Sequence, residues 1–122
     1  MKYLRVILLI IAVLTFFSGL SQMIKPGFVL NFIAGDQSLS NSHSFGIIGM
    51  FMLLFGGMVI HTLYEVNTSK TVLFWAGLQK IGAAIAVGLA IQKGLFNYLA
   101  GLVAIFDLLS GILFFVYLRK KD

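Results

Sequence analysis

The sequence contains no cysteine, a single proline and only four acidic residues among its 122 positions. The lack of cysteine excludes disulfides, thiolate metal ligands, cysteine catalysis and lipidation at cysteine. Charged residues make up 11% of the chain, whereas soluble proteins average about 25%. Hydrophobic residues make up 60%, and a soluble globule of this size cannot bury so much apolar surface. The composition therefore indicates a membrane protein.

Four long apolar runs account for most of the chain, at about residues 6–23, 44–64, 71–91 and 98–118. At ~1.5 Å per residue, a helix of about 20 residues matches a hydrocarbon core of ~30 Å. The alternating polarity of β-barrel strands is missing. The sequence therefore predicts an all-α, antiparallel four-helix membrane bundle that forms one transmembrane domain over residues 1–122.

The first apolar run has a second interpretation, as a cleaved signal peptide. It follows a basic start at Lys2 and Arg5, and small residues lie around Gly19. However, no Ala-x-Ala cleavage site is present, and apolar residues continue to Ile24. We expect a retained first helix, with cleavage as the alternative.

The basic residues predict the orientation, because cytoplasmic loops carry an excess of Lys and Arg. With the N-terminus inside, the outer side holds only Lys25 and Lys93. The inner side then holds Lys2, Arg5, Lys70, Arg119, Lys120 and Lys121. We therefore expect both termini in the cytoplasm and the protein in the cell (inner) membrane.

The connection between the first two runs is the longest. Pro26 and Gly27 should end the first helix, and residues 28–34 are apolar but too short to span. We expect them to form a short interfacial helix or to pack on the bundle top. Ser42 or Ser44 is expected to cap the second long helix, with His43 in the loop. The other connections are short, so consecutive helices should pack as hairpins.

Two ionisable residues, Lys80 and Asp107, lie deep inside the third and fourth runs. A charge at the centre of a membrane helix costs about 2.5–3.5 kcal/mol, so it usually has a partner. Both residues lie at about the same depth on either side of the short turn at residues 92–97. Small residues lie one turn from each, which lets helices approach closely. The sequence predicts an ion pair near the membrane midplane.

This pair has three interpretations. It is a neutralised pair that only fixes the register of the two helices, or it is a proton, ion or ligand site at the midplane. Alternatively, Lys80 extends to the interface or Asp107 is protonated and neutral. The sequence leaves all three open.

Other polar positions are secondary candidates. Gln79 points away from Lys80 and is expected to bond another helix, for example at Thr15 or Ser18. His61 and Glu65 lie one turn apart near the inner membrane boundary, but two ligands do not make a metal site. We predict no metal site, no cofactor and no catalytic residues, because no catalytic triad, carboxylate pair or metalloprotease motif appears. The sequence shows no basic groove with interleaved aromatic residues, so it does not predict nucleic-acid binding.

Three short segments are distinctive: residues 25–28 (Lys-Pro-Gly-Phe), 45–49 (Phe-Gly-Ile-Ile-Gly) and 106–108 (Phe-Asp-Leu). In these segments the chain resembles the DoxX-like group of small bacterial four-helix membrane proteins. Many of that group carry an arginine where this chain has Ser44 and Phe45, and a glutamate in the second helix that is missing here. The resemblance implies the fold and, for function, accessory roles that include redox-linked ones. Small multidrug transporters share the length, but their first helix carries a glutamate and this one has no acid.

These observations predict a non-enzymatic accessory subunit of a membrane assembly. Its expected partners are the lipid bilayer and either other membrane subunits or further copies of the chain. The alternative is a small carrier or ligand-binding membrane protein that uses Lys80 and Asp107. An enzyme acting on lipids or quinones is a third class. A carrier should have a midplane cavity beside the pair, and an accessory subunit should have a closed pair and a packed interior.

Overall fold

A computed structural model describes residues 2–33 and 35–121 of the chain. This part is helical, which confirms the all-α class. The helices are α1 (Lys2–Ile24), α2 (Pro26–Phe32), α3 (Leu39–Leu63), α4 (Lys70–Gln92) and α5 (Ala100–Lys121). The long helices α1, α3, α4 and α5 are each long and apolar enough to cross a membrane.

The break between α1 and α2 lies where the sequence predicts it. Helix α1 ends at Ile24, and Pro26 is in the first turn of α2, where its missing N–H is not needed. The seven residues of α2 form the expected short helix, and Leu30 on its inner face is fully buried. This segment therefore packs on the end of the bundle.

Helix α3 begins five residues before the predicted boundary, so the expected cap at Ser42 or Ser44 is wrong. The cap is Ser38, whose hydroxyl accepts a hydrogen bond from the backbone N–H of Asn41 at 3.3 Å. Asp36 in turn accepts the Ser38 backbone N–H at 3.0 Å. His43 consequently lies within α3, on its exposed side, and not in a loop. The capping side chain sets the start of the helix, whereas the apolar run marks only the most hydrophobic part of α3.

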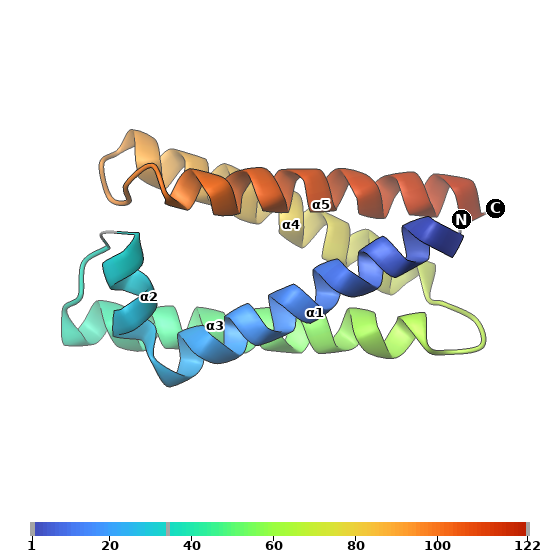
Figure 1. Cartoon of the computed structure of the whole chain (residues 1–122), viewed down its shortest axis with the longest axis horizontal. Coiled ribbons are helices and arrows are strands. Elements are labelled where there is room, and N and C mark those ends of the chain that lie inside the picture. Colours follow the sequence, from blue (N-terminus) through green and yellow to red (C-terminus); the bar gives the residue numbers. More distant parts are fainter. Residues whose placement is uncertain (1, 34, 122) are drawn as a thin grey trace.

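The long helices form two pairs. Helix α1 packs along α3, and α4 packs along α5, whereas contacts between the two pairs are much fewer (Figure 1). The expectation of a close hairpin holds for α4 and α5 but not for α3 and α4. These two helices are joined by a short link, yet they diverge because α3 packs against α1 instead.

The two pairs meet at both ends of the molecule. Near the chain ends, which lie together in Figure 1, an apolar core joins all four long helices. Its members include Leu8 of α1, Leu63 of α3, Leu73 of α4 and Phe114 of α5. At the opposite end, Leu30 and Ile33 pack with Ala100, which connects α2 to the start of α5. The middle of the molecule between these two clusters is less closely filled.

Glycines account for the close α1–α3 packing. A Cβ atom added to Gly49 would lie 2.7 Å from the carbonyl oxygen of Gly19, and one on Gly56 would lie 2.7 Å from the backbone nitrogen of Phe16. These neighbours are backbone atoms, so they cannot move aside without shifting a helix. Small residues that let backbones approach are typical of helix pairs in membranes.

We predict that Gly56→Ala destabilises the protein by about 1–3 kcal/mol, because the new methyl group overpacks the α1–α3 contact. Gly88→Ala is the matched control, since a Cβ atom there meets nothing within 4 Å. Thermal unfolding in detergent measures both. Equal melting temperatures for the two variants would contradict the close packing described here.

Candidate functional site: an ion pair at the floor of an apolar cavity

The predicted ion pair is present. Lys80 Nζ of α4 lies 3.4 Å from Asp107 Oδ1 of α5, and the two residues are only 5% and 8% exposed. Glycines bring these helices together, because a Cβ atom on Gly111 would lie 3.1 Å from the carbonyl oxygen of Gly77. Because α4 and α5 pack closely, two charged side chains at the same height along these helices come into contact.

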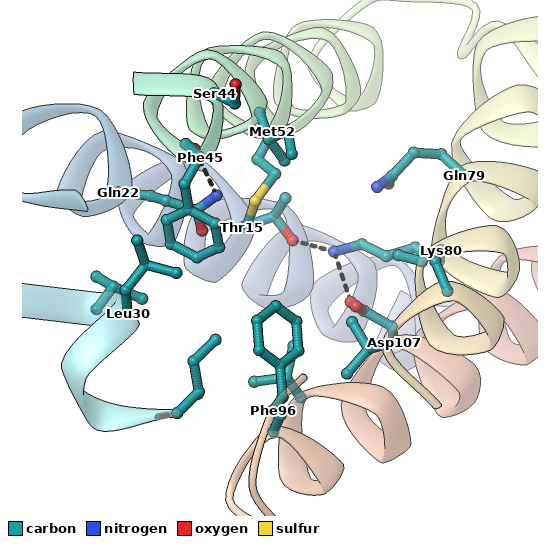
Figure 2. A pocket seen from close by; sticks show the side chains of 18 of the residues that line it. Thr15, Gln22, Leu30, Ser44, Phe45, Met52, Gln79, Lys80, Phe96 and Asp107 are labelled. Carbon is teal, nitrogen blue, oxygen red and sulfur yellow. Dashed lines mark hydrogen bonds and ion pairs between the residues drawn. The ribbon is translucent and has the colours of Figure 1, made fainter. Parts of the chain in front are cut away.

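The ammonium group of Lys80 also has partners outside this pair. It donates a hydrogen bond to the hydroxyl of Thr15 in α1, as Figure 2 shows. That hydroxyl donates in turn to the carbonyl oxygen of Ile11 at 2.9 Å. Lys80 Nζ further lies 5.3 Å from the ring centroid of Phe106, within the range of a cation–π interaction. The lysine thereby links the α4–α5 pair to the α1–α3 pair.

A cavity of about 390 Å³ lies beside the ion pair, in the middle of the molecule. This volume falls within the ~300–1,000 Å³ of typical small-molecule sites. Lys80 and Asp107 are its only charged lining residues among those that the structure describes. Most of the other walls are apolar, and Figure 2 shows Leu30, Phe45 and Phe96 around the space opposite the charges. The cavity thus has a charged floor and an apolar body.

The far end of the cavity is closed by α2. Leu30 and Ile33 line it there, and the backbone N–H of Asn97 donates to the carbonyl oxygen of Ile33 at 2.9 Å. This hydrogen bond attaches the end of α2 to the α4–α5 connection. This segment was expected to form a short interfacial helix or to pack on the bundle top. It packs there and forms a roof over the cavity.

The side of the cavity is open. Ser44 and Ile48 of α3 and Ala86 of α4 line the cavity, and all three are exposed. Because α3 and α4 diverge, these residues form an opening between the two helices. A molecule can therefore reach the charged floor from the side of the bundle.

The secondary candidates separate into two groups. Gln79 lines the cavity, but Thr15, one of its two expected partners, is bonded to Lys80 instead. His61 and Glu65 are exposed at the far end of α3 and take no part in the cavity. Within residues 2–33 and 35–121, His and acidic side chains form no group of three that would hold a metal ion.

Gln22 of α1 lines the cavity and was missed in the sequence. Its side-chain amide donates to the carbonyl oxygen of Phe45 at 2.9 Å, which joins α1 to α3 near the roof. The signal available in the sequence was the spacing of Thr15 and Gln22. Seven residues apart, they share one face of an otherwise apolar helix.

Comparisons with known proteins give no assignment. No family model, curated protein or solved structure matches this chain.

We predict that Asp107→Ala destabilises the protein by about 3–5 kcal/mol, because it leaves a buried ammonium group without its counter-charge. The double variant Lys80→Ala, Asp107→Ala should be destabilised less, since it removes both charges together. Melting temperatures in detergent compare the two. A double variant that melts below the single Asp107→Ala variant would show that the ion pair is not the reason for the loss.

Proposed function

We propose that the four long helices cross the cell (inner) membrane in alternating directions, with both chain ends in the cytoplasm. Their length and apolar composition support this arrangement. Large apolar side chains such as Phe17, Phe51 and Ile105 are exposed along the helices, where lipid would cover them. The two chain ends lie together (Figure 1), and most basic residues lie towards that end.

This topology predicts opposite labelling of the two ends of the bundle. Because the natural chain lacks cysteine, Gln37→Cys and Asn67→Cys each introduce a single thiol, at exposed positions before and after α3. A membrane-impermeant maleimide should label Gln37→Cys in intact cells and Asn67→Cys only after lysis. The reverse pattern would place the termini outside, and labelling of both in intact cells would contradict a spanning α3.

We further propose that the protein binds a small amphiphilic molecule in the cavity between its two helix pairs. The observation that carries this proposal is the cavity of about 390 Å³ with Lys80 and Asp107 at its floor. A lone charge pair would be sufficient to fix helix register, but it would need no adjoining space. Apolar walls with a few convergent polar groups are typical of ligand sites.

The accessory role inferred from the sequence is the less supported alternative. It leads one to expect a closed ion pair and a packed interior, whereas here the pair lines an open space. Membership of the DoxX-like group and the presence of partner subunits or further copies stay predictions. None of these is needed for the binding proposal.

Photolabelling in lipid vesicles tests the binding proposal. The probes are twelve-carbon chains that carry a diazirine and have a hydroxyl, a carboxylate or an ammonium head. At least one probe should label residues 44–52 or 96–107, and excess unmodified compound should reduce the labelling, because a defined site is saturable.

A matched pair of variants provides the control. Val103→Trp should abolish the saturable labelling because Val103 lines the cavity. Ile105→Trp should retain it, since Ile105 lies on the same helix outside the lining and is comparably exposed, at 59% against 45% for Val103. If no probe gives saturable labelling, or if Val103→Trp has no effect, the cavity is not a binding site.

A further inference from the structure

The hydrogen-bonding capacity at the cavity floor is only partly used. The ammonium group of Lys80 has three donors, of which Thr15 and Asp107 Oδ1 accept two. The other carboxylate oxygen of Asp107, Oδ2, has no hydrogen-bond partner among the described residues. Every completely buried side-chain nitrogen or oxygen in that part of the chain does have a partner. Oδ2 is therefore not sealed off, and Asp107 lines the cavity.

One N–H of Lys80 and one oxygen of Asp107 thus have no hydrogen-bond partner, on two side chains whose Nζ and Oδ1 atoms lie 3.4 Å apart. A hydroxyl group matches this arrangement, because it accepts from an ammonium group and donates to a carboxylate. Hydrogen bonds to charged groups contribute more than those between neutral groups. A bare alkyl chain would leave both groups unmatched, which is costly away from water.

The charge of the site points to an uncharged head group. Lys80 and Asp107 neutralise each other, and no other charged side chain lines the cavity in the described part of the chain. A carboxylate or ammonium head would lose its hydration without gaining an unpaired counter-charge. A neutral head that both donates and accepts loses much less on entry.

The shape of the site indicates where the rest of the molecule lies. The charged floor is at mid-helix, the apolar walls continue to the roof at Leu30 and Phe96, and the lateral opening lies between α3 and α4. In Figure 2, these apolar side chains face the same space as the Lys80–Asp107 pair. A single apolar chain therefore fits between the floor and the roof.

We propose that the cavity selects single-chain amphiphiles with an uncharged, hydroxyl-type head, which bridges the free donor of Lys80 and the free oxygen of Asp107. This inference rests on the proposed binding function and adds the chemical class of the ligand. The head group lies at the floor, and its chain extends along the apolar walls towards α2.

Competition between three ligands of equal chain length tests the selection. Dodecanol, dodecanoate and dodecylamine compete with the diazirine probes in vesicles at neutral pH, and each concentration is expressed per membrane volume to correct for partitioning. We expect dodecanol to displace the labelling at about tenfold lower concentration than either charged ligand. A wild-type preference for dodecanoate or dodecylamine would overturn the selection of neutral heads but leave the binding function standing.

Charge variants at the floor provide the second part of the test. Asp107→Asn keeps the shape and leaves an unpaired lysine, so the preference should shift about tenfold towards dodecanoate. Lys80→Met leaves an unpaired aspartate and should shift it towards dodecylamine. An order of preference that is unchanged in both variants would overturn the proposal.

A third variant covers the case in which the single variants do not fold. Lys80→Met combined with Asp107→Leu removes both charges and their hydrogen-bonding groups. It should still bind the probes, but dodecanol should displace them only at about tenfold higher concentration than with the wild-type protein, because the floor offers its hydroxyl no partner. Displacement by dodecanol at the wild-type concentration in this variant would show that Lys80 and Asp107 do not bind the head group. Failure of all probes with the wild-type protein would instead overturn the binding function itself.

Discussion

The position of a single ammonium group organises the centre of this molecule. Lys80 extends from α4 and contacts Asp107 on α5 and Thr15 on α1. These contacts are made in surroundings that are otherwise almost entirely apolar, where an unpaired charge is costly. The lysine therefore holds together two helix pairs that otherwise have few contacts with each other, and it does so at the point where the interior is open.

The cavity follows from how the helices divide their contacts. Glycines draw α1 against α3 and α4 against α5 so closely that an added Cβ atom would meet backbone atoms of the neighbouring helix. The apolar core joins the pairs only near the chain ends, and α2 joins them only at the opposite end. The diverging middle is left with a polar floor and apolar walls. Close packing within the pairs thus leaves space between them.

The same arrangement relates the ion pair to function. A pair used only for register would be best enclosed, because an enclosed pair excludes competing partners. Here, Lys80 and Asp107 line the cavity, and part of their hydrogen-bonding capacity is unused. Fixed, paired charges form a polar surface that is already oriented before any ligand arrives. Such preorganisation reduces the conformational entropy that side chains lose when a ligand binds.

Much of this was predictable from the sequence, because the relevant signals are local. Four long apolar runs determine four helices, and Pro26 determines the break after Ile24. The Lys80–Asp107 contact was also predictable, since a short turn places two buried charges at the same depth on adjacent helices. Where a local polar cap competed with hydropathy, the sequence was misleading: Ser38 starts α3 well before the apolar run.

Only the tertiary structure decided which helices pair and what lies between them. That α3 packs against α1 and diverges from α4 depends on glycine faces that meet across long sequence separations. The contributions of Thr15 and Gln22, and the roof formed by α2, depend on the same arrangement. The sequence by itself determined the helices and the depth of the charges, because apolar runs and turns act along the chain. The cavity is a property of packing, since its walls come from all five helices of the described chain and no one segment specifies it.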